Sequence, residues 1–488
     1  MQVKNSANEQ AREDKKAFAN IETRSFIVVV LLLGFLLAIS GILSYVIPQG
    51  EFSRDGSGAI IEGSYTLKED QKGIPVWRII TAPVRVFVSD DALTIIMISV
   101  FLLIMSGIFN LLEKTNGTKV VISRLMSKLA DKGAPVVCLC VLTFMLFGSF
   151  FGMFEELVTL LPLIIAFMLS MKMDTMTGLG ACLLAACFGF SAALTNPFSV
   201  GLAASIAGVP VMSGVWLRLV FFGLIYFILC AFLMDHVKTI EKNPELSLSY
   251  DVDTEKRKSG IGITEPCERN AENDRIFKVF CTFFAAQVVV LVVVASIRSI
   301  SGFAIPILAA SFLIGGLAAG LIVTGKKVEP FLHILRGAYA MIPAVLMIAL
   351  ASSIKLVMTE GDIIDSIMNY VINMLDGKSR FGSILLVYFL ILLLQVFIGS
   401  SSAKLMLVFP IVLPICQSIG ISSELVILAY CMADGFTDVI LPTNPVLLVG
   451  LSMANISYPK WVKWTWKLQC FVFALTVVIL LFATLIGY

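Results

Sequence analysis

Two Thr-Asn-Pro tripeptides interrupt apolar stretches of the chain, at residues 195–197 and 443–445. A proline removes a backbone donor and breaks a helix, which frees carbonyl oxygens, and the Thr and Asn side chains add further oxygens. Such oxygens can bind Na⁺, and the N-terminus of the half-helix that follows can bind a carboxylate. We predict that Thr195, Asn196, Thr443 and Asn444 bind substrate and that Asn196 and Asn444 also bind a coupling ion. The alternative is an ordinary proline kink satisfied by neighbouring helices.

A second group of candidate residues lies about 40 residues upstream of each tripeptide. Glu155 and Glu156 follow a Gly-rich stretch, and carboxylates at membrane depth are expensive to bury and mark functional sites. The alternative is that one of the two faces water at the membrane surface. Lys404 could pair with Glu156, bind an acidic group of the substrate, or extend outward. We predict substrate binding by Glu155, Glu156, Ser400, Ser401, Ser402 and Lys404.

Asp434 and Asp438 are one helical turn apart in the predicted helix 424–441 and could serve a coupling ion. Together with Glu155 and Glu156 they place four acids against one Lys near the predicted site. This balance favours a cationic substrate, or coupling to H⁺ or Na⁺, since clustered carboxylates raise one another's pKa. A capping or interfacial role is the alternative for Asp438.

These residues recur because the chain contains a repeat with an offset of 248 positions, which brings Pro162 onto Pro410 and Trp216 onto Trp464. Polar, Gly- and Pro-rich breaks at corresponding positions of two halves are typical of transporters with broken helices. Short apolar segments at 134–151 and 155–171, and at 381–398 and 404–416, predict one re-entrant hairpin in each half. The fold class is therefore an all-α polytopic membrane protein with two inverted repeats, two re-entrant hairpins and two broken helices.

The composition supports a membrane protein, since 58% of the 488 residues are hydrophobic and only 14% are charged. Apolar runs of about 20 residues match the thickness of a bilayer. A net charge of +2 gives no reason to expect a nucleic-acid partner. No HExxH, GxSxG or P-loop pattern occurs, so we expect no enzyme activity and no cofactor or metal beyond a coupling Na⁺ or H⁺.

The predicted organisation is a cytoplasmic tail (1–25), a first repeat (26–234), a charged cytoplasmic linker (235–275) and a second repeat (276–488). Each repeat begins with a scaffold and an interfacial helix, at 26–133 and 276–380. Each ends with a hairpin and transport part, at 134–234 and 381–488. Outside the hairpins, the predicted spans are 26–47, 93–112, 177–194, 215–234, 276–297, 303–323, 338–358, 424–441 and 464–488, with interfacial helices at 113–133 and 361–378.

The distribution of Lys and Arg predicts the orientation. Loops on the predicted cytoplasmic side (113–134, 235–275, 324–337 and 456–467) hold five, seven, three and three of these residues. The opposite loops (48–92, 208–213, 359–380 and 418–424) hold five, none, two and none. Positive charge in short loops marks the cytoplasmic side. This places the N-terminus in the cytoplasm and the C-terminus outside.

The motifs GMFEE (152–156), LTNPFSVGLAASIAGV (194–209), GSSSAK (399–404) and DGFTDVILPTNPVLL (434–448) resemble the YfcC-type C4-dicarboxylate anaerobic carrier family of the ion transporter superfamily. The resemblance covers nearly the whole chain. It implies an inverted-repeat fold, homodimers, elevator motion, and substrate and ion sites at the hairpin tips and broken helices. Some relatives are arginine/ornithine exchangers that share the Gly-Met-x-Glu-Glu pattern, but the second-half motifs are closer to other members.

The sequence thus predicts a multi-pass secondary transporter of the bacterial cytoplasmic membrane that carries a small charged metabolite. Basic amino acid exchange is the first hypothesis, and Na⁺- or H⁺-coupled transport of a C4-dicarboxylate is the second. A non-transporting receptor or scaffold is a rival, but the longest polar segments are too short for a soluble domain. A channel is disfavoured by two hairpins that would occlude it, and an intramembrane protease by two aspartates on one helix.

Overall fold

The computed structural model describes residues 23–53, 61, 63–69, 71–117, 119–121, 124, 133–258, 270–296, 303–326, 328–374 and 378–488. Residues 1–22 of the predicted tail, 259–269 of the predicted linker, and 122, 123 and 125–132 of the first predicted interfacial helix lie outside this set. Within it, seven helices are long and apolar enough to cross a membrane. The protein is an all-α polytopic membrane protein with one small two-stranded sheet.

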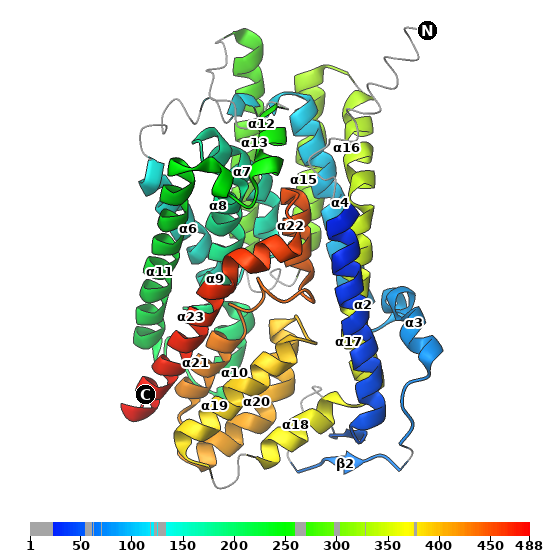
Figure 1. Cartoon of the computed structure of the whole chain (residues 1–488), viewed down its shortest axis with the longest axis vertical. Coiled ribbons are helices and arrows are strands. Elements are labelled where there is room, and N and C mark those ends of the chain that lie inside the picture. The colour runs from blue at the N-terminus through cyan, green and yellow to red at the C-terminus, as the bar shows by residue number, and fades with distance from the viewer. Residues whose placement is uncertain are drawn as a thin grey trace.

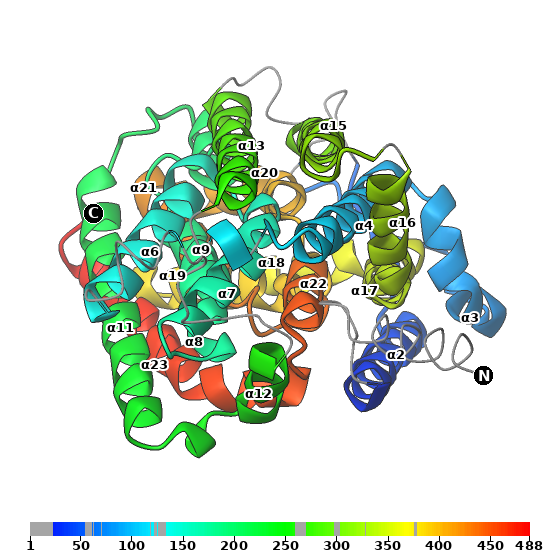
Figure 2. The ribbon, with the colours of Figure 1, turned by 90° about the horizontal axis from the view of Figure 1, so that it is seen from above.

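One side of the molecule is a bundle of long helices (Figures 1 and 2). Its members are α2 (Thr23–Val46), α4 (Ala92–Lys114), α13 (Ala271–Ser296), α15 (Ala304–Thr324), α16 (Glu329–Ala340) and α17 (Ile342–Glu360). Helix α4 packs on α15 and α16, and α17 packs on α2, so helices from both halves of the sequence share one bundle. Apolar side chains on these helices form part of the buried core.

Helix α16 corrects the predicted loop over 324–337. Its polar residues suggested a loop, but they lie on a helix that packs along α4 through small residues. A Cβ at Gly107 or Gly337 would overlap the partner helix, and Ser106 Oγ donates to Gly337 O at 2.8 Å. Asn110 Nδ2 donates to the carbonyl of His333 at 2.7 Å. Close backbone approach, which a hydropathy pattern does not report, stabilises this helix.

The polar excursion at 48–92 is folded onto the second half of the chain. It contains β1 (Gly50–Glu51), β2 (Thr66–Leu67), α3 (Val76–Arg85) and η2 (Val86–Val88). Lys68 Nζ binds Asp362 at 2.9 Å, Lys355 Nζ binds Asp91 at 2.6 Å, and Arg85 pairs with Glu360. Trp77 is 60% exposed on α3.

The first-half hairpin and broken helix follow the predicted order. The first hairpin consists of α6 (Gly133–Leu146), η4 (Phe147–Phe151), η5 (Glu156–Leu160) and α7 (Leu161–Ser170). The broken helix follows as α8 (Thr175–Leu179), η6 (Gly180–Leu184) and α9 (Ala185–Ser191), then a non-helical stretch at 192–196, the first break, then η7 (Pro197–Gly201) and α10 (Leu202–Ala207). Helix α11 (Val215–Lys242) ends this half and runs eight residues beyond the predicted span.

The second half repeats this order of elements. Helix α18 (Ile364–Asn373) precedes the second hairpin, which is α19 (Arg380–Gln395) and α20 (Ser401–Ser418). The broken helix is α21 (Ser423–Ala433) and α22 (Pro445–Ala454), separated by the second break at 434–444, and α23 (Tyr458–Leu485) is last. The prediction that the helix continues to residue 441 was wrong. Gly435 lies so close to the backbone of Ser191 that a Cβ would overlap it, and the chain leaves the helix there.

The connection between the halves is also structured at its beginning. After α11 come η8 (Pro244–Leu246) and α12 (Tyr250–Lys258), which has two acids in its first turn and three bases in its last. This charge order suits the helix dipole. Figure 1 shows α12 at the upper end of the molecule, far from the turn between α20 and α21 at the lower end.

Candidate functional site

The first break is held by the backbone at the tip of the first hairpin. The carbonyl of Ser149 accepts from the N–H groups of Leu194, Thr195 and Asn196 at 3.0, 3.3 and 3.1 Å. The Ser149 hydroxyl donates to the carbonyl of Ala192 at 2.7 Å. These bonds satisfy backbone groups that the end of α9 leaves without helical partners, as burial requires. The hairpin tip thereby determines where Asn196 lies.

Asn196 caps the half-helix that starts at Pro197. Its Oδ1 accepts from the N–H of Phe198 at 2.9 Å, the side chain is fully buried, and its Nδ2 finds no acceptor among the described residues. Gly152, with φ of +69°, lies so close that a Cβ there would overlap Asn196 Oδ1. A buried amide donor at a helix N-terminus can bind a carboxylate. Thr195, only half-buried, donates to the carbonyl of Phe150 at 3.1 Å.

Arg218, on α11, is a buried cation beside this break. It was not among the residues predicted from the sequence. Its guanidinium donates to the carbonyls of Leu194 at 2.9 Å, Val211 at 2.5 Å and Ser213 at 3.0 Å. One side chain thus contacts the first break itself and the segment just after α10. The sequence did indicate it, because Arg218 is the one charged residue in the predicted span 215–234. A charged residue within a membrane span is a candidate functional residue.

The second break contains a buried ion pair. Lys404, near the start of α20, pairs with Asp434 at the end of α21, with side-chain exposures of 0% and 1%. Ser401 donates to the other oxygen of Asp434, and the Tyr430 hydroxyl donates to the carbonyl of Ser401 at 2.5 Å. Of the three predicted possibilities for Lys404, extension outward is wrong because the amine is fully buried, and binding of an acidic group of the substrate stays a prediction. The amine neither extends outward nor binds Glu156 in any bond that the structure describes.

Asp438 is the second acid of this break and is held by a neutral donor. Gln395, at the end of α19, donates through Nε2 to Asp438 Oδ1. Asp438 lies in the non-helical stretch and not, as predicted, on a helical face with Asp434. Asn444 caps α22, accepting from the N–H of Val446 at 2.9 Å, as Asn196 caps the first half-helix. Thr443 is buried, and its hydroxyl finds no partner among the described residues.

The two breaks approach each other from opposite halves. Ser191 Oγ at the end of α9 lies 3.3 Å from the carbonyls of Cys431 and Met432, and Cys187 Sγ donates to Gly435 O at 3.0 Å. Each half-helix also packs on the hairpin of the other half. Helix α10 contacts α20, and α22 contacts α7 and η5. The tripeptides 248 positions apart therefore belong to one region of the molecule.

Glu155 of the first hairpin lies beside α4 and α22. Glu155 lines an apolar cavity with α4 residues including Phe101 and Leu102 and with Val446 in the first turn of α22. The side chain of Glu156 lies outside the described part. The prediction of four acids around one Lys therefore stays a prediction for Glu156, while the structure pairs Lys404 with Asp434 and places Glu155 beside α22.

The serines predicted to bind substrate divide into two groups. Ser401 contacts Asp434, as above. Ser400 is exposed and caps α20, accepting weakly from Ala403 N at 3.4 Å, and Ser402 is half-buried. In the described residues, no three His, Cys, Asp or Glu side chains are arranged to hold a metal ion. The oxygens available at the breaks come from Asp, Asn, Thr, Ser and the backbone.

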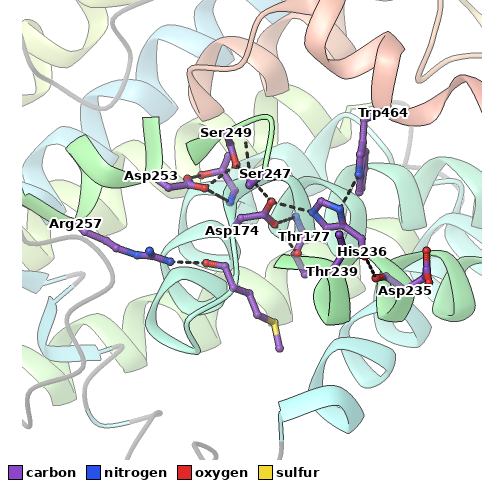
Figure 3. A network of polar contacts seen from close by, with 12 residues as sticks. Asp174, Thr177, Asp235, His236, Thr239, Ser247, Ser249, Asp253, Arg257 and Trp464 are labelled. Atoms are coloured by element: carbon purple, nitrogen blue, oxygen red, sulfur yellow. Dashed lines mark hydrogen bonds and ion pairs between the residues drawn. The ribbon is translucent and has the colours of Figure 1, made fainter. Parts of the chain in front are cut away.

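A second polar network lies between the two halves at the level of α12 (Figure 3). Asp174, the N-cap of α8, accepts from Thr177, Ser247 and His236 at 2.6, 2.6 and 2.8 Å. Trp464 Nε1 donates to His236 Nδ1 at 3.1 Å. An indole N–H can only donate, so His236 Nδ1 accepts. His236 Nε2 therefore carries the hydrogen and donates a hydrogen bond to Asp174. This network joins α8, α11 and α23.

Known proteins similar to this chain are membrane transporters or are uncharacterised. YfcC of Escherichia coli (strain K12), whose name proposes basic amino acid antiport, is 27% identical over 408 residues, which cover 81% of this chain and 79% of that protein. An uncharacterised protein of Haemophilus influenzae (strain ATCC 51907 / DSM 11121 / KW20 / Rd) is 27% identical over 371 residues, covering 75% and 71%.

Two solved structures align over most of their length. The YdaH transporter of Alcanivorax borkumensis is 17% identical, with a TM-score of 0.41 and coverage of 95% of this chain and 98% of that one. MtrF of Neisseria gonorrhoeae, described within a class of antimetabolite efflux pumps, is 17% identical, with a TM-score of 0.41 and coverage of 93% and 94%. The profile of the C4-dicarboxylate anaerobic carrier family matches residues 25–485, and this chain belongs to that family.

Proposed function

We propose that this transporter-family protein exchanges basic amino acids, such as arginine and ornithine, across the membrane. The observation that carries the proposal is the second break, which holds two buried carboxylates and one ammonium group, and that group pairs with Asp434. Asp438 has the amide of Gln395 as its donor. A substrate that brings a cationic group to Asp438 would complete the charge balance there.

The half-helix N-termini supply the complementary half of an amino acid site. A basic amino acid carries a carboxylate in addition to its cationic side chain. The Asn196 Nδ2 group is buried without an acceptor, at the start of a helix whose dipole favours an anion. Arg218 adds a fixed positive charge near the same break. Carboxylate at the first break and cation at the second would orient the substrate.

Lys404 would act as a tethered substitute for the cation of the substrate. In the ligand-free protein it neutralises Asp434 in a fully buried position. An unpaired carboxylate there would be costly, because burial of an isolated charge is strongly unfavourable. Arrival of a guanidinium or ammonium group would displace the amine, and departure would allow it to return. This role fits an exchanger that needs no external cation.

A coupled carrier of C4-dicarboxylates is the second candidate. The name of the family favours it, and two capped half-helices could each receive one carboxylate. Asp434 and Asp438 would then serve a proton or Na⁺ transported with the substrate. A coupled carrier needs a cation gradient, whereas an exchanger needs only substrate on both sides of the membrane.

The remaining features of the proposal follow from the resemblance. We propose a homodimer in the bacterial cytoplasmic membrane whose hairpins and broken helices move as an elevator against the bundle of long helices. The linker and N-terminus would face the cytoplasm and the C-terminus the outside. The Lys and Arg distribution supports this orientation.

The test is uptake into proteoliposomes of labelled arginine, ornithine and succinate, each with and without Na⁺ and pH gradients and with or without unlabelled substrate inside. Arginine entry that requires internal ornithine and no gradient supports the exchanger. Gradient-driven succinate entry supports the second candidate. Absence of uptake for all three contradicts both and favours a receptor, and unsaturable flux indicates a channel.

A further inference from the structure

Lys256 is a buried lysine in the connection between the halves, outside the region of the two breaks. It lies on α12 and is 8% exposed, whereas Lys258 on the same helix is exposed. Its Nζ donates to the carbonyl of Ala454 at 2.6 Å and to Thr175 Oγ1 at 3.0 Å. Ala454 is the last residue of α22, and Thr175 is the first of α8. One ammonium therefore joins an end of each half's broken helix.

The contact with Ala454 concerns the same helix that Asn444 caps. Helix α22 has ten residues, so its two ends lie about 15 Å apart. A helix of this length moves as a rigid rod, and a shift of its C-terminal end moves its N-terminal end as well. A cation at the C-terminus also interacts favourably with the helix dipole. Lys256 thus contacts the C-terminal end of α22, and the N-terminal end of the same helix lies at the second break.

Asp253, one turn earlier on α12, binds the same Thr175 hydroxyl that accepts from Lys256. Its carboxylate accepts from the Thr175 N–H at 3.2 and 3.3 Å, from the Thr175 hydroxyl, and from Ser249 Oγ at 2.6 Å. Ser249 in turn bonds Ser247, which donates to Asp174. Figure 3 shows this series of contacts continuing through His236 to Trp464 on α23. The connection is thereby attached to α8, α11, α22 and α23.

The charged groups around Lys256 come from three elements. Asp253 is on its own helix, Asp174 and Lys172 belong to the turn before α8, and His236 on α11 reaches Asp174. Arg257 donates to the carbonyl of Met173 at 2.8 Å. Burial lowers the pKa of Lys256 to about 8, although Asp253 opposes the change. Burial raises the pKa of Asp253, and Lys256, Ser249 and Thr175 oppose that rise.

The pKa of Asp174, unlike that of Asp253, is lowered, so Asp174 does not titrate in the alkaline range where Lys256 does. Burial alone would raise the pKa of Asp174, but His236, Ser247 and Thr177 outweigh it and keep the pKa below its usual value. Asp174 therefore stays a carboxylate across the neutral and alkaline range. Burial makes the charged amine costly at this site, so the buried position becomes more favourable once Lys256 has lost its proton, and the neutral amine can still donate to Ala454.

We propose that Lys256 is a positioning residue that holds the C-terminal end of α22, and with it the Asn444 end of the transport site, and that this hold becomes firmer when the lysine loses its proton at alkaline pH. The proposal rests on the proposed function in one respect, that Asn444 belongs to the transport site. It gives the connection between the halves a regulatory role: the pH on its side of the membrane would set how firmly α22 is held.

The experiment measures the KM for labelled arginine in exchange with internal ornithine, from pH 6.5 to pH 9.5 on the side of α12. The wild-type KM should fall about five-fold through a transition that begins near pH 8, because each pH unit above this pKa favours the held position of the lysine. Lys256→Arg, which stays charged, should remove the transition, and Lys256→Met should give a high KM at every pH. Lys258→Arg is the matched control and should keep the wild-type transition.

A second readout needs no transported substrate and so separates this proposal from the proposed function. Thr443→Cys, in a variant without other cysteines, is treated with a soluble maleimide over the same pH range. Because the thiolate fraction rises with pH in every variant, the rate with Lys256 is divided by the rate with Lys256→Arg at the same pH. This ratio should fall above pH 8, and the proposal is overturned if it is the same at every pH or rises. A failure of arginine exchange alone contradicts the proposed function and leaves the labelling result decisive here.

Discussion

Lys404 and Asp434 form a pair whose members depend on each other. Both are fully buried, so removing one partner leaves an uncompensated charge. Lys404→Met or Asp434→Asn alone should each destabilise the protein by about 3–5 kcal/mol. The double variant should cost clearly less than the sum, because no lone charge remains. Thermal unfolding in detergent, arranged as a double-mutant cycle, measures the coupling, and additive effects would show that the pair is not coupled.

Asn196 and Asn444 have a capping role and a proposed binding role, which can be separated. Loss of a cap costs about 0.5–2 kcal/mol, so Asn196→Ala and Asn444→Ala should unfold only slightly earlier than wild type. Exchange should nevertheless be abolished in both. Asn243→Ala is the matched control, since Asn243 caps η8 by accepting from Glu245 N, away from the breaks. Full exchange activity in both site variants would remove the broken helices from the binding site.

For individual residues, the sequence predicted which positions belong to the site better than it predicted which side chains touch. The repeat identified Asn196 and Asn444 as equivalent, and both cap half-helices. The same offset aligned Lys404 with Glu156, yet equivalence in a repeat gives no information on which side chains touch. Lys404 instead binds Asp434, which comes from α21. Gln395 and Arg218 were visible as polar residues in apolar runs, but their partners depend on how the segments pack.

At the scale of elements, the turn of the first hairpin depends on Gly152. Its φ of +69° disfavours a side chain, and a Cβ would overlap Asn196 Oδ1. Gly208 has a similar φ of +66° but open space around it. Both Gly152→Ala and Gly208→Ala should cost about 1–2 kcal/mol of backbone strain. Only Gly152→Ala should also reduce exchange, at least ten-fold, and equal uptake by the two variants would contradict this role of the hairpin tip.

Hydropathy patterns predicted most helices because a membrane span must be apolar along its length. They were less able to predict α16, whose stability comes from close packing of Gly107 and Gly337 against α4. They also extended α21 to residue 441, because Asp434 and Asp438 have helical spacing and nothing in the sequence reports the contact of Gly435 with Ser191. Elements that depend on a specific neighbour were the ones missed.

At the scale of the whole molecule, stability should depend on pH through Lys256. Its pKa is about 8 in the folded protein, against an ordinary value of 10.5. Between these values the unfolded chain binds more protons, so folding becomes more favourable as pH rises. The melting temperature of wild type should therefore increase relative to Lys256→Met between pH 8 and pH 10. A difference that stays constant, or shrinks, would show that burial does not depress this pKa.

The two ends of the molecule allow a test of orientation. Lys258 on α12 and Ser418 at the end of α20 are both exposed and lie at opposite ends (Figure 1). In a cysteine-free variant, Lys258→Cys should react with an impermeant maleimide only in inside-out vesicles. Ser418→Cys should react only in intact cells. The reverse pattern would invert the orientation, and labelling of both from one side would contradict the path of the chain.

The measurement that tests the central claim most directly is exchange in proteoliposomes containing the wild-type protein. Labelled arginine is added outside, with unlabelled ornithine or buffer inside and no ion gradient. We predict saturable arginine uptake that requires internal ornithine and is lost in Asp438→Asn, whose side chain cannot balance a cationic substrate. Uptake of succinate driven by Na⁺ or H⁺, with none of arginine, would contradict the claim and assign the acids of the second break to the coupling ion.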